Sequence, residues 1–281
     1  MKSKYLAPEQ IADYAKHLRT EERAPGTVEK YVRDARSFLH WLDGRPVSRD
    51  LAARWRDTLV ERGLAPSTVN SMVAALNGLF AHLGLDECRV KSLRVQRRLF
   101  RDSSRELTRQ EYRRLLDAAR VRGQDRLALL METICATGIR VSEVRSMSVE
   151  AARAGRTVIS LKGKIRTILL PSKLCRKLLR FARQQKTASG EIFLTRSGTS
   201  LNRRQIWAEL KGLCRQAGVA PTKVFPHNLR HLFATIFYTA CRDIARLADV
   251  LGHSSIETTR VYLISSGAEH ARQLEALGLV T

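Results

Sequence analysis

Apolar residues recur three and four positions apart through the first part of the chain, with polar residues between them. One such stretch follows Gly26-Thr27 and comprises Val28, Tyr31, Val32, Ala35, Phe38, Leu39 and Leu42. Another follows Pro66-Ser67 and comprises Val69, Met72, Val73, Leu76, Leu79, Phe80 and Leu83. Shorter amphipathic segments follow Pro8 and Ser48. The spacing predicts four helices that pack as a bundle, which we take as a domain over residues 1–88.

The pattern changes in the second part of the chain, where helical and alternating segments are mixed. Thr108 and Glu111 have the spacing of a helix capping box, and a further apolar helix is predicted from about Asp125 to Ala136. The chain after Leu170 is mainly helical. We expect this part, residues 106–281, to form a second domain.

Two β-rich runs, residues 157–161 and 165–170, interrupt these helices. They flank Lys162-Gly163-Lys164 and predict a hairpin with a basic tip. The chain as a whole is therefore expected to be mainly α with one small β-hairpin, an α+β fold in two domains.

Between the two parts the composition becomes strongly basic. Residues 89–105 contain seven Lys and Arg and one acid, Asp102, without helix caps or a strong apolar period. A charge run of this kind is usually a solvated surface. Here it also predicts an interdomain linker that could lie along phosphates.

The charge of the whole chain favours a polyanionic partner. Its 281 residues carry 50 Lys+Arg against 27 Asp+Glu, a formal net charge of +23, and nucleic acid is the partner that such an excess favours. An anionic membrane is the second choice, but no stretch approaches the ~20 apolar residues of a spanning helix, so no membrane partner is expected.

The five cysteines are scattered and lack C-x-x-C spacing. They indicate reduced thiols of a cytoplasmic protein, and neither a zinc site nor a disulfide framework.

Several residues suited to phosphodiester chemistry occur in order along the second part. They lie in A-T-G-I-R-V-S-E, which contains Arg140 and Glu143, in P-H-N-L-R-H, which contains His227 and Arg230, and in L-G-H, which ends at His253; Tyr262 follows nine residues later. Each has an ordinary structural explanation when taken alone, such as a packed aromatic ring for Tyr262. The ordered set is much more specific than any one member.

These segments resemble the tyrosine recombinase (phage integrase) family, which is similar to this chain from about Thr108 to Leu277. The family pattern is an arginine in T-G-x-R-x-S-E, a hairpin lysine, H-x-x-R, L-G-H and a tyrosine. The first domain resembles the family's helical core-binding (SAM-like) domain in pattern only. The resemblance implies a site-specific DNA recombinase that cuts and rejoins strands through a 3′-phosphotyrosyl bond and a Holliday junction.

The resemblance also implies a role for each residue. Tyr262 would be the nucleophile, and Arg140 and Arg230 would clamp the phosphate with bidentate guanidinium forks. The hairpin lysine would be the general acid, placed at Lys162 with Lys164 as the alternative. His227 would assist at the Tyr262 oxygen, and His253 would bind the scissile phosphate. Glu143 would orient Arg140 or a histidine, with a surface helix residue as an equal possibility.

The resemblance further implies a homotetramer on two double-stranded DNA sites, with neither metal nor other cofactor. It also implies that a C-terminal segment, here residues 268–281, packs on a neighbouring protomer, with a helix on its own protomer as the simpler alternative. Integration or excision of a mobile element is the first expectation. Xer-type resolution of chromosome or plasmid dimers and a type IB topoisomerase-like activity are alternatives. A non-catalytic DNA-binding module is the rival from another class. His231, beside Arg230 but turned away from it on a helix, is expected to be a core or supporting residue.

Overall fold

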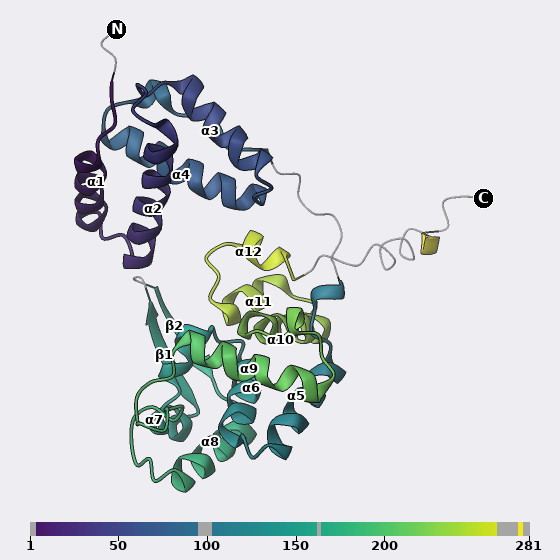
Figure 1. The fold of residues 1–281 in the computed structure, drawn as a ribbon. Coiled ribbons are helices and arrows are strands. Elements are labelled where there is room, and N and C mark those ends of the chain that lie inside the picture. Colours follow the sequence, from purple (N-terminus) through teal and green to yellow (C-terminus); the bar gives the residue numbers. More distant parts are fainter. Residues whose placement is uncertain (1–3, 95–102, 162–163, 263–274, 278–281) are drawn as a thin grey trace. The chain divides into compact units, whose positions relative to one another are not determined.

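The computed structural model describes residues 4–94, 103–161, 164–262 and 275–277, without the side chains of residues 103, 161 and 164 (Figure 1). It divides into two compact units, Met1–Arg97 and Arg98–Thr281. Each unit has a hydrophobic core of its own. The predicted mainly α fold with one small hairpin is confirmed.

Four helices build the N-terminal unit: α1 (Pro8–Thr20), α2 (Pro25–Leu42), α3 (Arg49–Glu61) and α4 (Pro66–His82). Proline opens three of them, where its missing N–H has no helical partner to lose. The core is centred on Phe38, whose ring meets those of Trp55 and Phe80 edge-on at centroid distances of 5.2 and 5.9 Å. These contacts join α2 to α3 and α4.

Two asparagines of α4 hold the chain that follows the bundle. Asn77 exchanges two hydrogen bonds with the backbone of Val90, and Asn70 does the same with Leu93. The first half of the basic segment is therefore bound to the N-terminal unit, and residues 95–102 lie outside the described ranges.

The C-terminal unit is built around α6. Its helices are α5 (Arg109–Val121), α6 (Asp125–Thr137), α7 (Val149–Ala154), α8 (Ser172–Gln184), α9 (Arg203–Ala217), α10 (Pro226–Cys241), α11 (Ile244–Leu251) and α12 (Ile256–Arg260), with a 3-10 helix η3 (Val141–Ser146) after α6. Helices α5, α8, α9 and α10 all contact α6. The predicted capping box of α5 is present, because Thr108 and Glu111 bond each other's backbone N–H groups.

Strands β1 (Arg156–Leu161) and β2 (Lys164–Leu169) form the predicted antiparallel hairpin. Ile159 and Ile168 are buried in the core of the unit, whereas Ile165 and Leu169 on the other face are 74% and 73% exposed. The tip, residues 162–163, lies outside the described residues.

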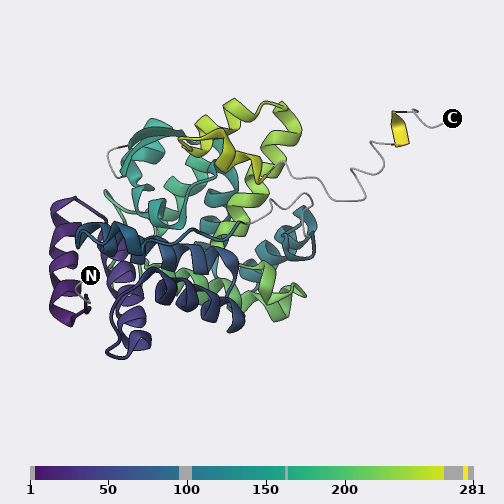
Figure 2. The same cartoon turned by 90° about the horizontal axis from the view of Figure 1, so that it is seen from above.

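Helices α10, α11 and α12 follow one another at one end of the C-terminal unit (Figure 2). They enclose a small apolar cluster of their own, formed by Ala234, Leu247, Leu251 and Tyr262. In the described part of the chain, no helix combines the length and apolarity that crossing a membrane requires.

Candidate active site

Arg140 is positioned by the end of α6. Gly138 closes that helix in the left-handed region, at φ 64°, and a Cβ there would lie 2.4 Å from the ring of Phe233. Only glycine meets both conditions. Arg140 then caps η3: its backbone N–H donates to Glu143 Oε2 at 2.6 Å, and its Nη1 donates to Oε1 at 3.0 Å. The Arg140 side chain remains 38% exposed, so its guanidinium is open to a ligand.

Glu143 is 2% exposed and is shared between two arginines. Besides Arg140, it accepts a hydrogen bond from Nη2 of Arg166, which lies on β2. Burying a carboxylate is costly unless it is paired, and these two guanidiniums supply that pairing. The alternative in which Glu143 is a surface residue is wrong, and its role in orienting Arg140 stays a prediction.

Arg230, on α10, is buried, with 3% of its surface exposed, and it connects α10 to the ends of α6 and α11. Its Nη1 donates to the carbonyl of Gly138 at 2.5 Å, and its Nη2 donates to the carbonyl of Leu251 at 2.8 Å. Burial, followed by the charge of Arg140, lowers the pKa of Arg230 to about 10, so it stays charged at neutral pH.

His253 follows the C-terminus of α11, where Gly252 has a φ of 63°. Its Nε2 lies 2.9 Å from Arg230 Nη2, and its Nδ1 lies 2.9 Å from Thr259 Oγ1. A guanidinium can only donate, so Nε2 accepts and the ring proton is assigned to Nδ1. Burial, together with Arg230 and Arg140, lowers the pKa of His253 to about 4, which keeps the ring neutral.

His227 is the second residue of α10, one turn before Arg230, and it is exposed. Partial burial of its ring and the charges of Arg230, Arg140 and Arg203 lower its pKa. A neutral imidazole at the surface, surrounded by cations, can accept a proton from a neighbouring group.

Tyr262 is 4% exposed, packed in the apolar cluster beside the arginines. Its ring is stacked on that of His253 at 6.1 Å and meets His231 edge-on at 4.9 Å. It is thus both a packed aromatic residue and a neighbour of Arg230. His231 contacts the ring of Tyr262, and its role as a core or supporting residue stays a prediction.

The structure brings Arg140, Glu143, Arg230, His253 and Tyr262 into one hydrogen-bonded and stacked group, with His227 in electrostatic contact. Lys162 and the side chain of Lys164 lie outside the described residues, as does most of residues 268–281. Arg166 and Thr259 were missed by the sequence reasoning, although both bond directly to members of the group.

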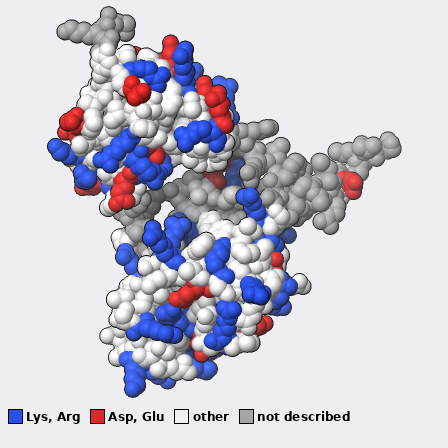
Figure 3. Space-filling model, viewed as in Figure 1, with Lys and Arg blue, Asp and Glu red and all other residues white. Residues whose placement is uncertain are grey.

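Cations dominate the electrostatics of this group. In the described part of the chain, Glu143 is the one carboxylate hydrogen-bonded to Arg140, Arg166 or Arg230. One negative charge against three positive ones leaves an uncompensated excess, which suits an anion. In Figure 3, basic side chains also cover more of the visible face of this unit than acidic ones do.

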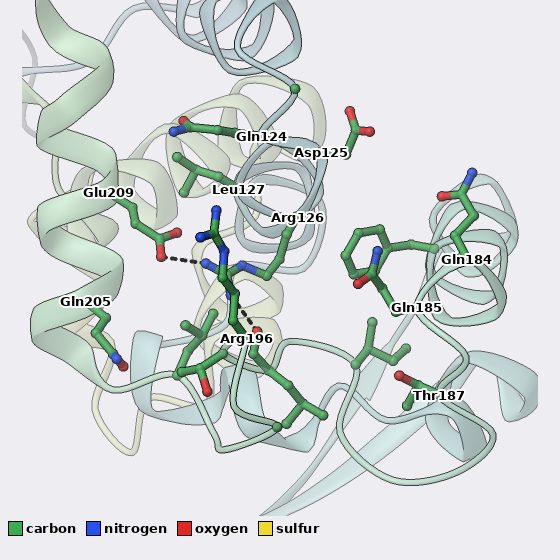
Figure 4. Close-up of a pocket in the computed structure, with 17 residues that line it drawn as sticks. Gln124, Asp125, Arg126, Leu127, Gln184, Gln185, Thr187, Arg196, Gln205 and Glu209 are labelled. Atoms are coloured by element: carbon green, nitrogen blue, oxygen red, sulfur yellow. Dashed lines mark hydrogen bonds and ion pairs between the residues drawn. The ribbon is translucent and has the colours of Figure 1, made fainter.

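A separate cavity of about 860 Å³ lies between the start of α6, the end of α8 and α9 (Figure 4). Arg126 lines this cavity and donates hydrogen bonds to the carboxylate of Glu209 and to the backbone carbonyl of Leu194. None of the predicted site residues lines it, so it is distinct from the group around Arg230.

Comparison with known proteins relates both units of the chain to a protein family. The family model "Phage integrase family" matches residues 105–269, and "Phage integrase, N-terminal SAM-like domain" matches residues 11–85. The tyrosine recombinase XerA of Pyrococcus furiosus is 29% identical, with 99% of both chains covered. That of Thermococcus kodakarensis is 30% identical, covering 95% of this chain and 94% of the relative.

Two solved structures share the fold. XerH recombinase bound to a palindromic difH substrate, a post-cleavage complex, has a TM-score of 0.73 at 20% identity and covers 97% of this chain and 84% of the other. A lambda integrase tetramer bound to a Holliday junction has a TM-score of 0.73 at 16% identity, covering 90% and 76%. The two family models and the relative from Thermococcus kodakarensis establish that the chain belongs to the phage integrase family of tyrosine recombinases, which cleave and rejoin DNA.

Proposed function

We propose that Tyr262 attacks the scissile phosphate and forms a 3′-phosphotyrosyl bond, releasing the 5′-oxygen. The observation that carries this is the position of Tyr262: its ring is stacked on that of His253, whose Nε2 lies 2.9 Å from Arg230 Nη2. A tyrosine with a pKa near 10 needs about 4 kcal/mol of help to ionise fully at pH 7. A phosphate bound by Arg230 would lie close to His253 and Tyr262, and His227 is the neutral base beside the same cations.

Arg140 and Arg230 are the proposed clamp on the phosphoryl oxygens. Both are held by short bonds to Glu143 or to backbone carbonyls, so their forks are preorganised for the charge that develops in the transition state. Guanidinium groups supply this stabilisation without a metal ion. The covalent ester conserves the energy of the broken bond, so rejoining requires no ATP.

His253 completes the clamp, and a hairpin lysine supplies the proton. Both ring nitrogens of His253 already have protein partners, so contact with a phosphate would exchange its bond to Arg230. The general acid for the leaving oxygen is proposed to be Lys162, with Lys164, the first residue of β2, as the alternative.

The proposed substrate is a pair of double-stranded recombination sites held by four protomers, which exchange strands through a Holliday junction. The lambda integrase tetramer on such a junction, which shares the fold, supports this assembly. Integration or excision of a mobile element is the first proposal, supported by the shared fold of a transposon integrase. The nearly full-length match to XerA proteins favours dimer resolution as the second. The five unpaired cysteines support action in the cytoplasm.

The test uses a nicked suicide duplex that carries a site selected by the protein from random-sequence duplexes. We expect wild-type protein to trap a covalent adduct and Tyr262→Phe to bind the duplex without forming one. Tyr238→Phe is the matched control, since Tyr238 packs against the same cluster, and it should keep the adduct. An adduct in Tyr262→Phe would contradict the assignment.

A further inference from the structure

Arg166 is a partly buried cation that the proposed chemistry does not use. It lies in the middle of β2, opposite Ile159, with its side chain 12% exposed. Its Nη2 donates to Glu143 Oε2 at 2.5 Å, and its Nη1 donates to the backbone carbonyl of Val250 at 3.1 Å. Arg166 therefore connects the hairpin to η3 and to the last turn of α11.

A glycine beside Arg166 leaves space for its side chain. Gly252 lies against its side chain, and a Cβ at that position would be 2.4 Å from Arg166 Cδ and 2.9 Å from Nη1. Any other residue at position 252 would displace the guanidinium. Gly252 therefore ends α11 and also leaves room for the arginine.

We propose that Arg166 is a positioning residue for DNA cleavage, acting through Glu143 on Arg140 and through the end of α11 on Arg230. This proposal rests on the clamp role of Arg140 and Arg230 stated above. Oε2 of Glu143 accepts from Arg166 Nη2 and from the backbone N–H of Arg140, whereas Oε1 accepts from Arg140 Nη1. Without Arg166, the whole negative charge of Glu143 would act on the Arg140 guanidinium alone, and the clamp would have less positive charge left for a phosphate.

The second connection acts on the other arginine. Val250 accepts from Arg166, and the next residue, Leu251, accepts from Arg230 Nη2. The same turn leads into His253, whose Nε2 also faces Arg230. A shift of this turn would therefore move both acceptors that orient Arg230. Burial lowers the pKa of Arg166, but an arginine stays protonated at neutral pH.

Arg166 could instead act by holding the hairpin and its general-acid lysine. Two modified substrates separate these roles. A bridging 5′-phosphorothiolate has a leaving group that departs without a proton, so it rescues a lost general acid. A neutral methylphosphonate carries less charge on its oxygens, so it reduces the demand on a guanidinium clamp.

The experiment measures single-turnover cleavage by the full chain, at saturating protein, on the suicide duplex in its normal, phosphorothiolate and methylphosphonate forms. The variants are Arg166→Met, Arg166→Lys, Arg140→Ala and Lys162→Ala. Arg156→Gln, an exposed cation of the same hairpin, controls for charge, and Ile168→Val, a buried neighbour on β2, controls for stability. Thermal unfolding is followed for each.

We expect Arg166→Met to cleave normal DNA about 100-fold more slowly, the size of effect that a misplaced catalytic group produces. The loss should persist on the phosphorothiolate and shrink on the methylphosphonate, as for Arg140→Ala. Arg166→Lys should lose less, because one ammonium can keep one contact, and the two controls should cleave normally. If Arg166→Met does not fold, the same pattern in Arg166→Lys decides.

A near-normal rate in the Arg166 variants, or rescue by the phosphorothiolate as for Lys162→Ala, would overturn the positioning role. The proposed function fails separately, if Arg140→Ala itself cleaves normal DNA at the wild-type rate.

Discussion

In the N-terminal unit the buried carboxylate of Asp34 is paired with Lys30 and Arg33, its neighbours on the same helix. In the C-terminal unit Glu143 is paired with Arg140, three residues before it, and with Arg166, which lies on a strand 23 residues away. The first pairing needs only α2. The second exists only when η3 and the hairpin are folded together, so the geometry of the site depends on the whole unit.

The two units also differ in net charge. Residues 1–97 contain 17 basic and 12 acidic residues, a net charge of +5, whereas residues 98–281 contain 33 and 15, a net charge of +18. The unit with the larger excess is also the one in which two guanidiniums share the carboxylate of Glu143 and a third, that of Arg230, lies in the same site. Positive charge is thus in excess both over the whole C-terminal unit and within its site, as expected if this unit binds the reacting phosphate as proposed.

The largest expected effect is the dependence of DNA binding on salt. With about six to ten phosphate contacts, affinity should fall roughly 10³–10⁵-fold between 50 and 200 mM salt. Arg203→Gln, which removes an exposed cation near His227, should reduce the slope of log affinity against log salt by about one. Fluorescence anisotropy with a labelled duplex measures both. An affinity that does not change with salt concentration would contradict the conclusion that the positive charge of the chain binds DNA phosphates.

The hairpin lysine comes next, because general acid catalysis contributes about 10²–10⁴-fold. Lys162→Ala should be inactive on normal DNA and substantially rescued on the 5′-phosphorothiolate. Lys164→Ala should show weaker binding without selective rescue, and so serves as the matched control. Rescue of Lys164→Ala alone would place the general acid two residues further along the hairpin.

The clamp itself is tested by conservative substitutions. Arg140→Lys and Arg230→Lys keep the positive charge but lose the planar guanidinium fork. Each should raise the activation free energy of cleavage by about 3–4 kcal/mol, by analogy with the loss of an oxyanion-hole donor. Single-turnover rates at saturating protein provide the measurement. Lys30→Arg on α2, the equivalent exchange in the local pair of the N-terminal unit, should leave the rate unchanged. Near-normal rates in either clamp variant would mean that point charge alone suffices.

Residues with local signals could be predicted from the sequence. Helical spacing, the Thr108 capping box and the glycine that ends α6 all act within a few residues, and the structure contains each of them. The ordered motifs likewise identified Arg140, Arg230, His253 and Tyr262, which the structure brings together.

Arg166 and Thr259 could not be found in this way. In Ile165-Arg166-Thr167-Ile168-Leu169 apolar residues fall on both faces of the strand, so alternation does not show which face is buried. Only the packed structure shows that Ile165 and Leu169 face outward and that Arg166 therefore faces Glu143. Thr259 gave no signal either, because a hydroxyl that orients a histidine has no characteristic spacing.

The smallest expected effect concerns histidines, which the two units place in opposite surroundings. His17 and His82 of the N-terminal unit lie beside the carboxylates of Glu21 and Asp13, whereas His253 lies beside arginines, and its pKa falls to about 4. The unfolded chain, with a histidine pKa near 6.5, then binds more protons than the folded chain between these values. The stability contribution of neutral His253 is therefore complete above pH 6.5 and is lost as the pH falls toward 4.

His253→Gln should flatten part of this pH dependence, because an amide can accept from Arg230 or donate to Thr259 without titrating. The measurement is the urea concentration at the midpoint of unfolding, for wild type and variant, at pH 7 and pH 4.5. Carboxylates that titrate in this range do so in both proteins, so their effect cancels in the difference between the two midpoints. The gap between the two proteins should narrow at the lower pH. A gap that stays constant would mean that His253 titrates alike in the folded and unfolded chains, so that the surrounding arginines do not act on it as the structure indicates.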